Sequence, residues 1–108
     1  MIDWDRVKDL KAELGQEDFA EVAVMFMEEA DEVIARLTGA AGADVLEQDL
    51  HFLKGAALNL GFAQLASLCQ DGERRAAAGL TDVDLGPVRA SYAVSRQAFL
   101  AETGMQSV

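Results

Sequence analysis

The apolar residues of this chain recur at alternating spacings of three and four, and that spacing places them on one face of an α-helix. The clearest run consists of Phe19, Val22, Phe26, Ala30, Val33 and Leu37. Proline, which breaks helices, occurs once, at Pro87. The β-branched residues that favour strands are sparse, whereas Ala, Leu, Glu, Asp, Lys and Arg dominate. The sequence therefore predicts an all-α protein.

The breaks between periodic runs define five helical segments, at residues 3–14, 18–37, 44–60, 62–78 and from about residue 84 onward. Asp3 and Asp44 are placed to cap the first and third segments, and Pro87 falls in the first turn of the last, where its missing N–H costs little. We predict one domain over 1–108 with a frayed tail at 103–108. Four long amphipathic helices with short connections favour an up-and-down antiparallel four-helix bundle, to which the short N-terminal helix is added at one end.

The charge excludes several classes of partner. Nineteen acidic residues against nine basic ones give a formal net charge of −10, which disfavours binding to nucleic acid and to anionic membranes. Self-repulsion at this charge favours a monomer. The first residues lack a signal-peptide pattern, and no apolar run approaches the ~20 residues of a membrane span, so we expect a cytoplasmic protein. Cys69, the only cysteine, lies in an apolar helical pattern and is expected to be buried and inert.

The only histidine, His51, lies on the polar side of its predicted helix. The apolar stripe of that helix consists of Leu46, Leu50, Leu53, Ala57 and Leu60. His51 lies about 140° around the axis from the middle of this stripe. Lys54 and Gly55 follow three and four positions later and are its neighbours on the helix surface. The imidazole is therefore expected to face solvent or a partner.

The residues around His51 fit phosphoryl acceptance better than metal binding or hydrolysis. A metal site needs several convergent ligands, and the chain offers one histidine and one cysteine. A phosphoryl acceptor needs an exposed nucleophile and a nearby cation, which Lys54 supplies as a mobile ammonium. Gly55 leaves space for an incoming protein, at a cost of about 1 kcal/mol in helix stability. Leu58, about 20° from His51, suits docking or a peripheral core position equally well.

The sequence around and after His51 resembles that of a known family. The string His51-x-Leu53-Lys54-Gly55-x-x-x-x-x-Gly61, followed by Leu65 and Cys69, resembles the signature of histidine-containing phosphotransfer (HPt) domains. The resemblance covers nearly the whole chain and implies a helical bundle that relays phosphoryl groups between receiver domains. By position, it makes His51 the phosphorylated residue on its ring nitrogen remote from the backbone, Lys54 the phosphate support, and Gly55 the clearance for the receiver. Family members often have a hydroxylated residue after this glycine, where Ala56 stands here, and the resemblance leaves Gly72 unexplained.

We therefore expect a phosphoryl carrier without ATP-dependent kinase activity of its own. It needs no cofactor, because the Mg²⁺ ion is expected in the partner receiver domain. The expected partners are response-regulator receiver domains and a hybrid sensor histidine kinase. Leu58, Gln48 and Glu47 are candidates for partner binding, and the last two, one turn before His51, are also placed to orient its ring. The net charge indicates that apolar contact contributes more to docking than electrostatic steering.

Two alternatives remain open. The first is a helical interaction module that binds receivers or kinases without carrying phosphate, and the second is a small metal- or cofactor-binding bundle. Incubation with a phosphorylated receiver separates the first from a relay. An acid-labile, alkali-stable label that is lost in His51→Gln indicates the relay, whereas no label with any receiver indicates the binding module. The second alternative requires stoichiometric metal or a chromophore in the purified protein.

Overall fold

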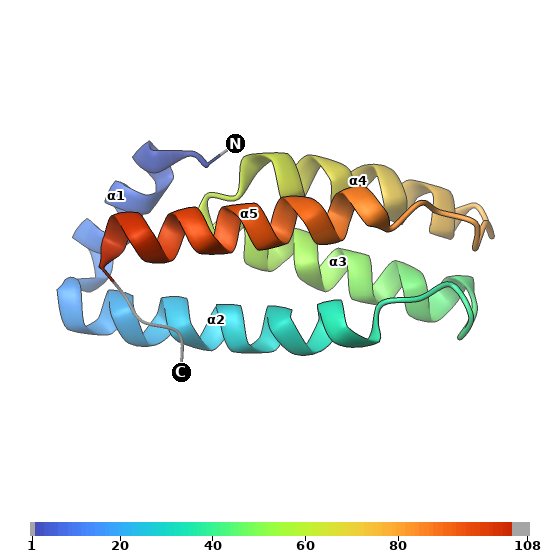
Figure 1. Ribbon diagram of the computed structural model, residues 1–108, viewed down its shortest axis with the longest axis horizontal. Helices are drawn as coiled ribbons and strands as arrows, with labels where there is room; N and C mark the ends of the chain where they lie inside the picture. Colours follow the sequence, from blue (N-terminus) through green and yellow to red (C-terminus); the bar gives the residue numbers. More distant parts are fainter. Residues whose placement is uncertain (1, 105–108) are drawn as a thin grey trace.

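A computed structural model describes residues 2–104, which form five helices and no strand of a sheet. The helices are α1 (Trp4–Leu14), α2 (Gln16–Arg36), α3 (Ala43–Leu60), α4 (Ala63–Ala77) and α5 (Gly86–Thr103) (Figure 1). Their ends lie within about two residues of the predicted ends. The largest difference is the start of α2, because Gly15, at φ 79°, ends α1 and begins α2 in a single residue. The predicted all-α class is confirmed.

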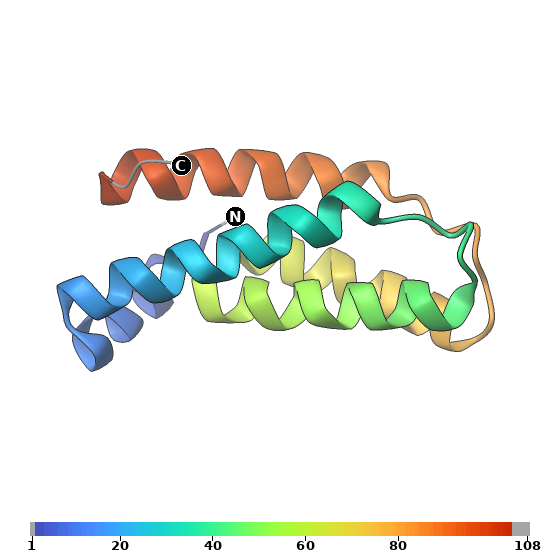
Figure 2. The same cartoon turned by 90° about the horizontal axis from the view of Figure 1, so that it is seen from below.

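The four long helices run along the 41 Å axis of the molecule, and α1 lies at one end, where it packs against α2 and α3 (Figures 1 and 2). The α2–α3 and α4–α5 connections lie together at the opposite end in both views. This is the predicted up-and-down four-helix bundle with a short additional N-terminal helix. Within residues 2–104, no helix combines the length and hydropathy that a membrane span requires.

The core contains side chains from all five helices. The Phe99 ring of α5 lies 5.7 Å from the Phe62 ring and 6.0 Å from the Phe19 ring, measured between centroids. The apolar stripe of α3 is fully buried, with exposed fractions of 1% or less, and consists of Leu46, Leu50, Leu53, Ala57 and Leu60. Because this stripe faces the core, the opposite side of α3, which carries His51, faces outward.

Two details of the helix ends differ from the prediction. Gly42, not Asp44, is the residue before α3, and Asp44 lies in the first turn, where its charge still favours the helix N-terminus. Thr103 belongs to α5, and its hydroxyl donates a hydrogen bond to the carbonyl of Phe99 at 2.6 Å. The helix then ends at Gly104 in a left-handed conformation. The rest of the predicted tail, 105–108, lies outside the described residues.

The left-handed turn at Gly61 joins α3 to α4 and holds the N-terminal segment. Gly61 has φ 78°, and its carbonyl accepts a hydrogen bond from the Asp3 amide at 2.6 Å. A Cβ atom at this position would lie 2.7 Å from the Asp3 carbonyl oxygen. The glycine therefore allows both the turn and the close approach of the chain before α1.

Gly72, which the family resemblance left unexplained, lies where α4 approaches α3. A Cβ atom at Gly72 would lie 2.9 Å from the Leu50 Cδ1 atom, which is too short for a normal contact, and 3.4 Å from Val83. Leu50 is completely buried and has little room to move. The missing side chain therefore sets how closely α4 packs on α3, and the next residue, Glu73, is the one that reaches His51.

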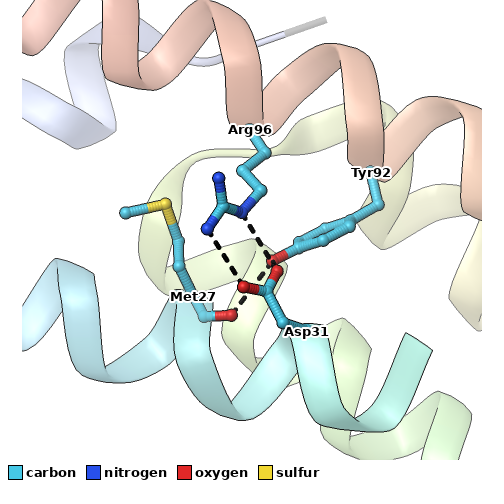
Figure 3. Close-up of polar contacts among 4 residues, drawn as sticks. All are labelled: Met27, Asp31, Tyr92 and Arg96. Carbon is cyan, nitrogen blue, oxygen red and sulfur yellow. Dashed lines mark hydrogen bonds and ion pairs between the residues drawn. The ribbon is translucent and has the colours of Figure 1, made fainter. Parts of the chain in front are cut away.

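Helices α2 and α5 are joined by a polar cluster at their interface (Figure 3). The Arg96 guanidinium donates two hydrogen bonds to the Asp31 carboxylate, each at 3.0 Å. The Tyr92 hydroxyl bonds to the same carboxylate and lies 3.1 Å from the carbonyl oxygen of Met27. Burial, together with the Asp31 carboxylate, raises the pKa of Tyr92, so the phenol stays protonated and keeps these contacts. The cluster fixes α5 on α2 at a defined register.

Candidate functional site

His51 lies near the middle of α3 with 69% of its side chain exposed, as the helical spacing predicts. One ring nitrogen, Nδ1, lies 2.6 Å from the Oε2 atom of Glu73 on α4. An ionised carboxylate can only accept a hydrogen bond, so Nδ1 carries the proton and donates a hydrogen bond to Glu73. In the neutral imidazole, this arrangement leaves the lone pair on Nε2, the nitrogen remote from the backbone.

Glu73 connects the two basic groups of the site. Its second oxygen, Oε1, accepts a hydrogen bond from the Lys54 ammonium at 2.6 Å, and only 17% of its side chain is exposed. The hydrogen bond from Lys54 lowers the pKa of Glu73, and the contact with His51 lowers it further, against an opposing effect of burial. Glu73 is therefore a carboxylate at neutral pH, as the assignment of the His51 proton requires.

Lys54 lies beside His51 as predicted, but its ammonium is not free in solution. The side chain is 24% exposed, and its charge is paired with Glu73. The ammonium therefore lies at a fixed place next to the imidazole. A negatively charged group added to the His51 ring would therefore lie close to the Lys54 ammonium.

Gly55 leaves the surface next to His51 open. A Cβ atom at this position would have nothing within 4 Å among the residues described. The helix continues through this position, and the Gly55 carbonyl also accepts a hydrogen bond from the Asn59 side-chain amide at 2.9 Å. The packing of the chain itself gives no reason for a glycine here, which is compatible with the predicted clearance for a partner.

The three predicted partner-binding residues surround His51 on α3. Leu58 is 57% exposed on the same face, Gln48 is exposed, and Glu47 is half-buried. Within residues 2–104, neither Glu47 nor Gln48 forms a hydrogen bond with the imidazole, which is held by Glu73.

Glu73 is the residue that sequence reasoning missed. It lies twenty-two positions after His51 and on a different helix, so helical spacing does not connect the two. The available signal was its position at the border of the inner face of α4, directly after Gly72.

Cys69 is separate from this chemistry. The thiol is fully buried, and burial raises its pKa to about 12, with a smaller contribution from the charge of Glu73. It stays protonated at neutral pH, as expected for an inert core cysteine. Among residues 2–104, no three His, Cys, Asp or Glu side chains come together in a way that could hold a metal ion.

Comparison with known protein families matched this chain to the Hpt domain over residues 21–98. The matched stretch contains all of α3 and α4, with the His51, Lys54 and Glu73 cluster, and most of α2 and α5. The comparisons with curated proteins and with solved structures returned no match. Because the match covers most of the chain, and the helical bundle is the one the resemblance implied, this protein belongs to the Hpt domain family, whose members are phosphotransfer modules of two-component signalling.

Proposed function

We propose that this protein relays phosphoryl groups between the aspartates of receiver domains through a phosphohistidine at His51. The observation that carries the proposal is the state of the imidazole. Its Nδ1 proton is held by Glu73 at 2.6 Å, and the side chain is 69% exposed. A nucleophilic nitrogen is thereby fixed in a reactive tautomer at a place that another protein can reach.

The chemical step exchanges one bond for another. The Nε2 lone pair attacks the phosphorus of a receiver aspartyl phosphate, the N–P bond forms, and the P–O bond to the aspartate breaks. The aspartate carboxylate leaves with the electron pair of that bond. The Nδ1 proton stays on the ring during attack. In the reverse direction, a second receiver aspartate displaces the imidazole, and the carrier is regenerated.

The neighbouring charges match the charges that appear in this step. Phosphorylation at Nε2 gives the ring positive character, which the Glu73 carboxylate at Nδ1 stabilises. The phosphoryl group brings negative charge, and the Lys54 ammonium is held next to the ring to receive it. Because Lys54 also neutralises Glu73, the carboxylate and the phosphoryl group can be accommodated side by side.

We further propose that the Mg²⁺ ion and most of the transition-state stabilisation come from the receiver, and that this chain supplies no cofactor and no kinase activity. The partners are receiver domains and a hybrid sensor histidine kinase, encountered in the cytoplasm by a monomeric carrier. The −10 charge and the family membership support this assignment.

A phosphotransfer profile tests the proposal. Each receiver domain of the host is phosphorylated with a radioactive phosphoryl group and mixed with the protein. The expected label is acid-labile, alkali-stable, absent in His51→Gln and retained in Gln97→Ala, an exposed control on α5. A label that survives in His51→Gln would contradict the proposal. Complexes with receivers that form without any label would indicate a binding module instead.

A further inference from the structure

A groove lies between α2 and α3, with a cavity volume of about 440 Å³, and its wall includes Phe52, the residue that follows His51. Its walls include three acidic side chains, one basic side chain, an amide and an aromatic ring, from Glu29, Glu32, Asp49, Arg36, Gln48 and Phe52. Glu29, Glu32 and Arg36 belong to α2, whereas the amide, the third acid and the ring belong to α3.

Two residues of the groove wall lie close to His51 on α3, about 60° and 100° around the helix axis from it. Phe52 follows His51 directly in the chain, and Gln48 lies one turn before it, both on the side of α3 that faces α2. Phe52 is 37% exposed, so part of its ring is available to a partner at the groove. A protein that approaches Nε2 from solvent therefore also meets this groove.

The charges of the groove are only partly compensated. Asp49 is 8% exposed, and its carboxylate pairs with the Arg36 guanidinium at 3.2 Å. Glu29 and Glu32 are both exposed, and within residues 2–104 neither carboxylate has an ion pair or a hydrogen bond. Two negative charges thus remain without a counter-charge beside an exposed aromatic ring.

We propose that this groove receives a basic side chain, lysine or arginine, of the receiver domain that docks on His51. The inference rests on the proposed function and adds a determinant of which receivers are accepted. The aliphatic stem of the basic residue packs on Phe52, and its charge lies between the carboxylates of Glu29 and Glu32. The Arg36–Asp49 pair neutralises Asp49, so it does not act as a third free charge.

This contact would allow an acidic carrier to discriminate between receiver domains. A net charge of −10 disfavours every receiver with an acidic docking face. A basic residue at the place that faces the groove offsets this repulsion locally. An acidic residue at the same place would add repulsion.

The test measures phosphotransfer to the receiver domain that the profile identifies as the fastest acceptor. Glu29→Gln/Glu32→Gln removes both charges at exposed positions, so helicity and the urea midpoint should stay unchanged. Glu13→Gln/Glu102→Gln removes the same charge on α1 and α5 and serves as the matched control. We expect the groove variant to raise KM about three- to tenfold with unchanged kcat, and the control to stay within about twofold of the wild type.

Two further variants separate the groove from long-range charge. Phe52→Ala should also raise KM, whereas Val94→Ala, an exposed apolar position on α5, should not. A Glu32→Lys carrier should regain transfer when the basic receiver residue opposite the groove is changed to glutamate. Groove and control variants with the same KM, or no recovery in the charge exchange, would overturn this inference and leave the proposed function intact. A wild-type protein that exchanges phosphoryl groups with no receiver overturns the proposed function itself.

Discussion

The substitution Gly55→Ala separates the stability of the bundle from its use as a phosphoryl carrier. Gly55 lies inside α3, where alanine is more favourable than glycine by about 0.8–1 kcal/mol. Beyond its chain neighbours and the nearby backbone of α3, a Cβ atom there has no atom of the described residues within 4 Å, so no clash reduces this gain. We therefore expect an increase of about 1 kcal/mol in the free energy of unfolding, or about 4 °C in Tm.

The same methyl group lies next to His51, on the face where a receiver must approach. A clash of one methyl group in a packed interface costs about 1–3 kcal/mol, which slows transfer about fivefold or more. The variant should therefore be more stable and less active than the wild type. Urea denaturation followed by circular dichroism measures the first effect, and initial rates of transfer from a phosphorylated receiver measure the second.

Gly72→Ala provides the matched comparison. The gain in helix propensity is the same at both positions, so it cancels in the difference between the two variants. The remaining difference is the packing cost of a Cβ atom 2.9 Å from the Leu50 side chain. We therefore expect the free energy of unfolding of Gly72→Ala to be about 1–3 kcal/mol below that of Gly55→Ala. Equal stability of the two variants would refute the role of Gly72 in α3–α4 packing. Full transfer activity of Gly55→Ala would refute the clearance role.

Further outcomes follow from three individual side chains. Glu73→Gln should slow transfer about tenfold or more, because the amide cannot stabilise a charged ring, as measured by single-turnover kinetics. The pKa of Glu73 is lowered in the folded protein, so its contribution to stability is present above the ordinary value of 4.5 and disappears as the pH falls below it. Urea midpoints of the wild type and Glu73→Gln should therefore converge at acidic pH, and a constant gap would contradict the ion pair. Ser95→Ala should raise the free energy of unfolding, measured by urea denaturation, by about 1 kcal/mol, since the buried hydroxyl has no hydrogen-bond partner among the described residues. A loss of stability would contradict this. Cys69, with its pKa raised to about 12, should resist iodoacetamide in the folded protein and react on unfolding, as followed by mass spectrometry.

The sequence predicted what depends on one helix at a time. The apolar stripe of α3 fixed which side is buried, and the exposure of His51 and the position of Lys54 next to it follow from the helical repeat alone. The bundle follows in the same way, because four amphipathic helices with short connections have few ways to cover their apolar faces.

The features that depend on how two helices meet could not be predicted. The contact of Glu73 with His51 requires a specific rotation and distance of α4 relative to α3, which the tight contact at Gly72 sets. The pairing of Lys54, predicted as a mobile ammonium, follows from the same contact. The groove beside Phe52 likewise depends on how α2 and α3 meet, since its wall includes residues of both helices. No spacing within one segment encodes these contacts.

The most direct test of the central claim is to locate the phosphoryl group on the His51 ring. The protein is labelled with ¹⁵N at histidine, phosphorylated by a receiver, and examined by two-dimensional ¹H–¹⁵N NMR at alkaline pH. Phosphorylation should appear at Nε2 of His51, the nitrogen that the contact between Nδ1 and Glu73 leaves accessible. A phosphoryl group on Nδ1, or on any residue other than His51, would contradict the account.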